Sequence, residues 1–72
     1  MLKIYTASWC THCSKLKAFL KNKGIGYVDV DIDVDIDEAM TLIDLGLQTI
    51  PQVFLPDGKH LGGCDVTIEH LS

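Results

Sequence analysis

The chain lacks the hallmarks of several protein classes. None of its apolar stretches approaches the ~20 residues that a helix needs to cross a bilayer. Three cysteines are an odd and sparse set, unlike the dense, even sets that staple small secreted domains. Six Lys and Arg residues against ten Asp and Glu give a net charge of −4, which does not favour binding to phosphate backbones. We therefore expect a cytoplasmic protein in a reducing compartment, with neither nucleic acid nor membrane as a partner.

Glycine and proline are also few, and this indicates an ordered chain. Six glycines, two prolines, 47% hydrophobic and 22% charged residues are typical of a globular protein. A chain of 72 residues can build only one core, so we expect a single domain over residues 1–72, and a monomer. Ordering it costs on the order of 100 kcal/mol of conformational entropy. Almost every apolar side chain is therefore expected to be used in the core.

The charges are unevenly divided along the sequence. Residues 1–28 contain five lysines and no acid, a charge of +5, whereas residues 29–72 contain ten acids and one lysine, a charge of −9. Solvated faces of helices and strands would account for this division. A surface that steers a charged partner would also account for it.

The first half of the chain predicts a strand, a helix and a strand. Residues 2–6 are apolar and β-prone. Apolar residues then recur at helical spacing, which predicts a helix over residues 11–23 with Gly24 as its stop. Residues 27–32 alternate with period two, as in a strand with one buried face.

The second half predicts a helix, a hairpin and a short helix. Asp35 followed by Glu38 matches a capping box, and an apolar stripe then runs as far as Gly46. Strands over residues 52–55 and 59–61 flank a tight turn, and Asp65 is expected to cap the last helix. The order is β-α-β-α-β-β-α. A right-handed parallel crossover at its start predicts an α/β fold in which three helices flank a mixed four-stranded sheet.

Cys10-Thr11-His12-Cys13 is the most informative segment. A C-x-x-C after a first strand and at the start of a helix places one sulfur at the helix N-terminus, where free N–H groups and the dipole favour a thiolate. Cys10 is therefore the candidate nucleophile. Cys13 lies one turn further and could attack a mixed disulfide on Cys10, which releases the partner and leaves an intramolecular disulfide.

Two other uses of these cysteines compete with redox chemistry. A stabilising disulfide is disfavoured because so small a loop gains less than the ~3 kcal/mol of a 15-residue loop. A zinc site could recruit Cys64 and one histidine, but the chain has no second C-x-x-C and no H-x-x-x-H. The strand before and the helix after the motif favour redox chemistry. We therefore predict no metal ligands.

Three segments together resemble the glutaredoxins of the thioredoxin-like superfamily. They are residues 5–13, 49–54 and 62–65, and the resemblance extends from Leu2 to about Leu71. Each segment alone is a weak signal, whereas the three in this order and spacing are specific. The resemblance implies a thioredoxin-like fold and a thiol–disulfide oxidoreductase. It also implies glutathione as co-substrate, no permanently bound cofactor, and protein disulfides as substrates.

The resemblance also implies a glutathione site. Pro51 would be a cis-proline beside the active cysteine, and the backbone of Ile50 would pair with the cysteinyl part of glutathione, next to Thr49. From the residues alone, an ordinary proline at a strand entry is the more common case for Pro51. Gly63, the N–H of Cys64 and the side chain of Asp65 would receive the γ-glutamyl end.

The sequence departs from glutaredoxins at three positions. Ala7 stands where a lysine is common, and His12 stands where an aromatic residue is common. His12 could bind the glycyl carboxylate of glutathione, or it could be an exposed histidine with no special role. Trp9 before Cys10 resembles thioredoxins, and it could present a flat surface to a protein substrate or be partly buried.

Two alternative functions stay open at this point. A thioredoxin-like electron donor, for example to ribonucleotide reductase, would be recharged by a flavoprotein reductase and would fit Trp9 and the missing lysine. An iron–sulfur or metal carrier would use Cys10 as a ligand, with glutathione as a further ligand.

Overall fold

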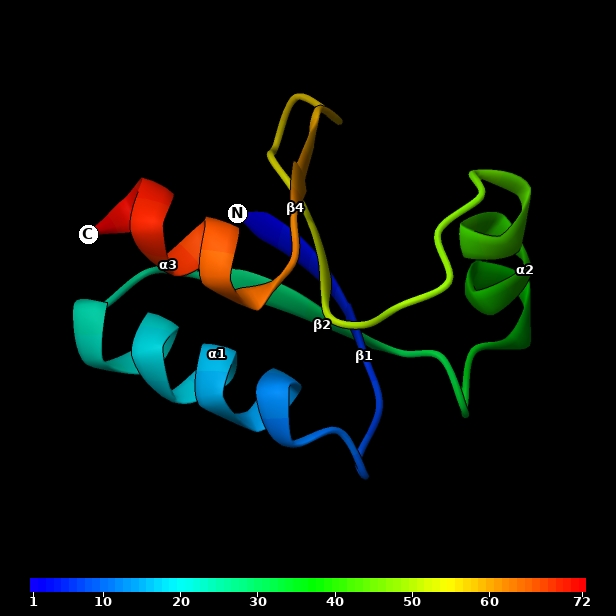
Figure 1. Ribbon diagram of the computed structural model, residues 1–72, viewed down its shortest axis with the longest axis horizontal. Coiled ribbons are helices and arrows are strands. Elements are labelled where there is room, and N and C mark those ends of the chain that lie inside the picture. Colours follow the sequence, from blue (N-terminus) through cyan, green and yellow to red (C-terminus); the bar gives the residue numbers. More distant parts are fainter.

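A computed structural model describes all residues of the chain, 1–72, and its elements follow the predicted order (Figure 1). The strands are β1 (Leu2–Thr6), β2 (Tyr27–Asp31), β3 (Gln52–Phe54) and β4 (His60–Gly62). The helices are α1 (Thr11–Lys23), α2 (Ile36–Asp44) and α3 (Cys64–Leu71). The predicted bounds of the strands differ from the observed ones by one residue at most. No helix combines the length and the apolar character needed to cross a membrane.

The four strands form one mixed sheet in the order β2-β1-β3-β4. Strand β1 is parallel to β2 and antiparallel to β3, and β3 is antiparallel to β4. The predicted mixed sheet and its parallel crossover are therefore confirmed. Strand β1 lies in the interior of the sheet, and the loop that follows its C-terminal end carries Cys10.

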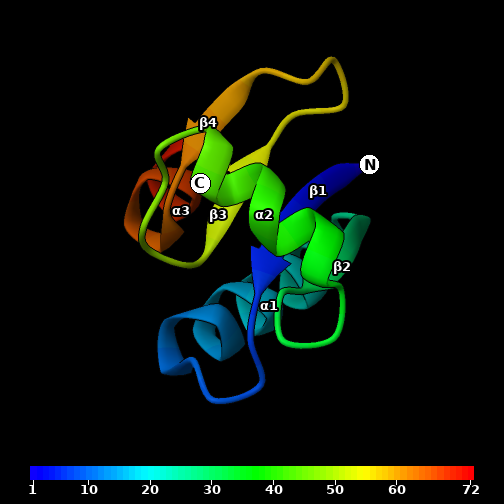
Figure 2. The same cartoon turned by 90° about the vertical axis from the view of Figure 1, so that its right-hand side faces the viewer.

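The main core lies between the sheet and the helices α1 and α3. Figures 1 and 2 show these two helices on one face of the sheet and α2 on the other. Ile4 and Val53 from neighbouring strands meet Leu16 and Leu20 from α1, and all four are fully buried. Burial of one such side chain stabilises the fold by about 1.5–3 kcal/mol. This core fixes α1 against β1 and so fixes the position of Cys10 and Cys13 at the start of α1.

Helix α1 begins and ends as predicted. Cys10 is its N-cap, and its Sγ accepts a hydrogen bond from the Cys13 N–H. Gly24 adopts a left-handed conformation with φ of 71°, and its N–H donates to the carbonyl groups of Leu20 and Lys21. A residue with a side chain would be strained at this φ, so glycine is the natural end of the helix.

Helix α2 has the predicted cap, but the expectation that its apolar stripe is buried is wrong. The Asp35 carboxylate accepts a hydrogen bond from the Glu38 N–H at 3.2 Å, but the reciprocal half of the predicted capping box is not formed, because the Asp35 N–H donates to the Asp31 carbonyl and the Glu38 carboxylate pairs with Lys3. Of the stripe, only Leu42 is buried, whereas Ile43 is 72% exposed and Met40 is 57% exposed. The reason is that α2 is the only helix on its face of the sheet, so no neighbour covers its outer side.

The predicted cap of α3 is also wrong. The N-cap is Gly63, and Asp65 lies inside the first turn. Gly62 at the end of β4 has a φ of 137°, and the chain turns there directly into the helix. The helix therefore begins earlier than the capping chemistry of Asp65 suggests. No side chain caps α3, although the Thr67 hydroxyl donates to the Gly63 carbonyl at 2.7 Å.

Candidate active site

Cys10 lies at the junction between the loop after β1 and the start of α1. Its side chain is almost buried, with 7% of the residue exposed. Its Sγ accepts the Cys13 N–H at 3.2 Å and lies 3.8 Å from the Ile50 carbonyl oxygen, to which the thiol donates. A backbone donor and the positive end of the helix dipole are the environment that stabilises a thiolate. The Ile50 carbonyl ties this sulfur to the loop before β3.

Cys13 has a different environment, although it is only one helical turn away. It is fully buried and packs in a small apolar cluster with Ala7 and Cys10. Burial and then the hydrogen bond with Cys10 raise the pKa of the Cys13 thiol to about 12. The Ala7 backbone and the Lys17 ammonium oppose this rise in pKa. All three cysteines are free thiols, so the structure describes the reduced protein.

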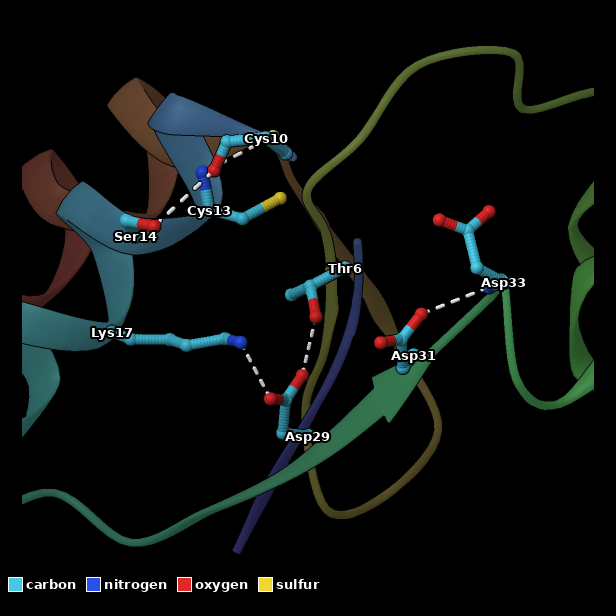
Figure 3. A network of polar contacts seen from close by, with 8 residues as sticks. All are labelled: Thr6, Cys10, Cys13, Ser14, Lys17, Asp29, Asp31 and Asp33. Atoms are coloured by element: carbon cyan, nitrogen blue, oxygen red, sulfur yellow. Dashed lines mark hydrogen bonds and ion pairs between the residues drawn. The ribbon is translucent and has the colours of Figure 1, made fainter. Parts of the chain in front are cut away.

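A charged network lies beneath Cys13 (Figure 3). Lys17 follows Cys13 by one turn of α1, and its Nζ is 2.5 Å from an Asp29 carboxylate oxygen on β2. The other Asp29 oxygen accepts a hydrogen bond from the Thr6 hydroxyl at the end of β1. Burial alone would raise the pKa of Asp29, but the hydrogen bonds from Lys17 and Thr6 lower it. The pKa of Lys17 is raised, mainly by its hydrogen bond to Asp29.

The sequence did not single out this network. The four-residue spacing of Cys13 and Lys17 on one helix was the available signal. The pairing of Lys17 with Asp29 depends on the register of β2 beside β1, in which Ile4 lies opposite Asp29. That register could not be read from the residue pattern alone.

All seven residues predicted to bind glutathione line one groove. Its volume is about 260 Å³, and Val66, which was not predicted, completes the lining. The predicted residues are His12, Thr49, Ile50, Pro51, Gly63, Cys64 and Asp65. They come from three separate parts of the chain: the first turn of α1, the loop before β3 and the first turn of α3. The groove reaches Cys10 through Ile50, whose carbonyl contacts the Cys10 thiol.

The loop before β3 is held by side chains of the hairpin. The Ile50–Pro51 peptide bond is cis. The Gln52 amide nitrogen donates to the Thr49 carbonyl at 2.9 Å and contacts the Thr49 hydroxyl at 3.1 Å. The Gln52 amide oxygen lies 2.7 Å from Nε2 of His60, so this ring nitrogen donates. Gln52 thus connects β4 to the groove wall, a role that the sequence did not suggest.

The N-terminus of α3 forms the opposite wall of the groove. Since no side chain caps this helix, the N–H groups of its first turn are free to bind a ligand carboxylate. Cys64 is 6% exposed and packs in the main core, and burial raises the pKa of its thiol. Its backbone, rather than its sulfur, is the part suited to binding.

The structure also places the three residues at which the sequence departs from glutaredoxins, which are Ala7, Trp9 and His12. Ala7 is 2% exposed, and its carbonyl accepts the Cys10 N–H at 3.1 Å. Trp9 is 67% exposed, and its indole N–H donates to the Asp33 carboxylate at 2.8 Å. Trp9 therefore lies on the surface, as one of its two interpretations expected, and it is not buried. His12 is exposed on the first turn of α1 and lines the groove.

A zinc site built from the cysteines is not formed. Nowhere in the structure do three or more His, Cys, Asp or Glu side chains gather closely enough to hold a metal ion. Cys64 in particular lies in the main core, and Cys10 and Cys13 lie in the neighbouring cluster. What the geometry does bring together is a dithiol, a groove and a free helix N-terminus.

Comparison with known proteins identifies the family. The model of the glutaredoxin family matches residues 2–61. The chain belongs to the glutaredoxin family. It is similar to glutaredoxin 3 of Escherichia coli K12, with 37% identity over 65 residues that cover 89% of this chain and 77% of that protein. The resemblance stated from the sequence is thereby confirmed.

Two solved structures extend the comparison. The glutaredoxin-like NrdH-redoxin of Escherichia coli, described as having a thioredoxin-like activity profile, superposes with a TM-score of 0.84 at 25% identity, over 99% of this chain and 93% of that one. A buckwheat glutaredoxin in complex with glutathione superposes with a TM-score of 0.81 at 32% identity, over 97% of this chain and 66% of that one. The fold is the thioredoxin-like fold of the glutaredoxins. Members of this family are thiol–disulfide oxidoreductases, and this chain carries the cysteine pair for that chemistry.

Proposed function

We propose that the chain is a dithiol glutaredoxin that reduces protein disulfides or glutathione mixed disulfides. The Cys10 thiolate attacks one sulfur of the substrate, forms a mixed disulfide and releases the other sulfur as a thiolate, which takes up a proton. Cys13 then loses its proton and attacks Sγ of Cys10, which releases the second substrate thiol and leaves the Cys10–Cys13 disulfide. Two molecules of reduced glutathione return two electrons and two protons and leave as glutathione disulfide.

The observation that carries this proposal is the groove beside Cys10. Glutathione has two carboxylates and an extended backbone. The free N–H groups of α3 suit one carboxylate, and His12, which also lines the groove, suits the other. The Ile50 backbone in the same lining suits the cysteinyl residue, whose sulfur would then lie beside Cys10. The buckwheat relative, which was solved with glutathione, supports the same choice of ligand.

The decisive experiment is glutathione-dependent reduction of a small mixed disulfide, coupled to glutathione reductase. We expect turnover by the wild type and none by Cys10→Ser. The Cys13→Ser variant should retain part of the deglutathionylation, because that reaction needs only the attack by Cys10. Full activity without Cys10 would contradict the assignment of the nucleophile.

A second candidate differs only in the source of electrons. The chain could be an electron donor, for example to ribonucleotide reductase, that a flavoprotein reductase recharges. Ala7 at the position of the common lysine and the exposed Trp9 favour this alternative, as does the likeness to NrdH-redoxin with its thioredoxin-like activity profile. Reduction of the Cys10–Cys13 disulfide by thioredoxin reductase and NADPH, without turnover by glutathione, would select it.

A further inference from the structure

The segment before β3 forms one wall of the groove beside Cys10, yet its backbone is scarcely tied to the rest of the fold. Figure 1 shows this segment as an extended stretch of chain between α2 and β3. None of the backbone–backbone hydrogen bonds involves a residue between positions 48 and 51. Because backbone groups of a folded chain normally have partners, this wall depends on contacts of another kind for its position.

Gln52 supplies those contacts. It is the first residue of β3, it is 6% exposed, and it lies opposite Tyr5 of β1, so its own backbone is held in the sheet. Its amide nitrogen donates to the Thr49 carbonyl at 2.9 Å and lies 3.1 Å from the Thr49 hydroxyl. The only other hydrogen bond to residues 48–51 is the one between the Cys10 thiol and the Ile50 carbonyl. Gln52 is therefore the main polar link between this wall and the sheet.

His60 on β4 fixes the orientation of the Gln52 amide. A carbonyl oxygen only accepts hydrogen bonds, so the amide must turn its nitrogen to Thr49 and its oxygen to Nε2 of His60, 2.7 Å away. The neutral ring with its hydrogen on Nε2 and the protonated ring both donate there, so protonation of His60 does not break the contact. The ring also packs against Phe54, with 4.9 Å between the ring centroids. Both strands of the hairpin thus hold the amide in place.

We propose that Gln52 is a positioning residue that holds the Thr49–Ile50 wall in the conformation that binds glutathione. The inference rests on the proposed function, and it adds the residue that prepares the groove for its ligand. A wall that is already ordered binds an extended ligand without the cost of ordering the wall during binding. Loss of the Gln52 amide therefore weakens the reaction with glutathione, whereas thiols that do not touch the wall react as before.

The test is reduction of the Cys10–Cys13 disulfide by glutathione and, in parallel, by 2-mercaptoethanol. In both reactions a thiolate attacks Sγ of Cys10, and Cys13 leaves as a thiolate that takes up a proton. A second reagent thiolate then attacks the mixed disulfide, which frees Cys10 and leaves the disulfide of the reagent. We expect Gln52→Met to slow the glutathione reaction about fivefold, as for the loss of one hydrogen bond, and to leave the 2-mercaptoethanol reaction within about twofold. An equal loss with both reagents, or no loss, would overturn the inference.

Two further variants serve as controls. Gln48→Met makes the same change in the same segment, at an exposed residue outside the lining of the groove, and should stay within about twofold of the wild type. His60→Phe keeps a ring beside Phe54 but removes the donor to Gln52. It should lose less than Gln52→Met, because the amide can still donate to Thr49. A loss in either control that exceeds the loss in Gln52→Met would overturn the role of Gln52.

The order of the wall in the ligand-free protein separates this inference from the proposed function. We expect ¹⁵N relaxation to give order parameters for the Thr49 and Ile50 amides that fall from about 0.85, the value of rigid backbone, towards about 0.6 in Gln52→Met. In the wild type and in Gln48→Met they should stay high. Unchanged order in Gln52→Met would overturn the inference, whatever the reductant. Order that is lost in Gln52→Met, in a protein whose wild type reacts no faster with glutathione than with 2-mercaptoethanol, would uphold the positioning by Gln52 and contradict the proposed function alone.

Discussion

The two cysteines of the motif differ because the start of α1 separates them. Cys10 is the N-cap, where a backbone N–H reaches its sulfur, while Cys13 is buried one turn further and its thiol has a raised pKa. The same difference suits the two steps of the proposed reaction. A thiol that stays protonated until the mixed disulfide forms does not compete with Cys10 for the substrate.

Alkylation of the reduced protein should therefore be selective. We expect iodoacetamide at neutral pH to modify Cys10 faster than Cys13 and Cys64, because the pKa of each of the latter two thiols is raised and the Cys10 sulfur is the one at the N-terminus of α1. Mass spectrometry of proteolytic fragments would measure this. In 6 M urea, all three thiols should react. Modification of Cys13 at the rate of Cys10 in the folded protein would contradict the difference in environment.

Lys17 should affect the second step more than the first. Its ammonium opposes the rise in the pKa of Cys13, so Lys17→Met should raise that pKa further and slow closure of the Cys10–Cys13 disulfide by several-fold. Single-turnover closure of a Cys10 mixed disulfide, followed against pH, measures this effect. The pH profile should shift to higher pH. Lys21→Met, one turn further along α1, is the matched control and should leave the profile unchanged.

At the scale of the elements, the cap of α2 offers a clear test. The helix has nine residues and buries only Leu42, so its hydrogen-bonded ends matter more than its packing. Asp35→Ala removes the bond to the Glu38 N–H and should lower the free energy of unfolding by about 1 kcal/mol. Urea unfolding and amide exchange in α2 would measure this. Asp37→Ala removes an acid from the first turn without removing the cap, and should cost less than half as much.

The residue pattern predicted where the helices and strands lie better than it predicted which of their faces are buried. The ends of α1 were predictable because Gly24 and the start at Cys10 are local features of the chain. The exposure of Ile43 was not, because periodicity shows which residues share a face but not what covers that face. Asp65 failed as a cap for a related reason, since the backbone of Gly62 already turns the chain into α3. The groove residues came from a family resemblance, and local pattern alone favoured neither Pro51 nor Gly63.

At the scale of the whole molecule, two ion pairs connect elements that are far apart in the sequence. Lys3 with Glu38 connects β1 to α2 at 3.0 Å, and Lys17 with Asp29 connects α1 to β2. The pKa of Glu38 is lowered by hydrogen bonds from Tyr5 and Lys3, and the pKa of Asp29 is lowered despite its burial. Both carboxylates thus favour the folded state only while they are ionised.

The stability of the protein should therefore fall in acid. A carboxyl group with a lowered folded pKa contributes stability above its unfolded pKa, 3.8 for Asp29, and loses it as pH falls through the folded pKa. We expect the free energy of unfolding to decrease below about pH 5, and Asp29→Asn should show a shallower decrease. Urea unfolding at a series of pH values measures both. Equal slopes in the two proteins would mean that Asp29 gains nothing from Lys17 and Thr6.

The core is one-sided, and this decides which substitutions the molecule tolerates. A domain of 72 residues has a free energy of unfolding of about 4–11 kcal/mol. Leu20 is fully buried between α1 and the sheet, so Leu20→Ala should cost about 2–5 kcal/mol, a large share of this free energy. Met40→Ala on the uncovered side of α2 should cost less than about 0.5 kcal/mol. Urea unfolding followed by circular dichroism compares the two. A cost for Met40→Ala that rises with protein concentration would show that a second copy covers this face, since only association makes stability depend on concentration.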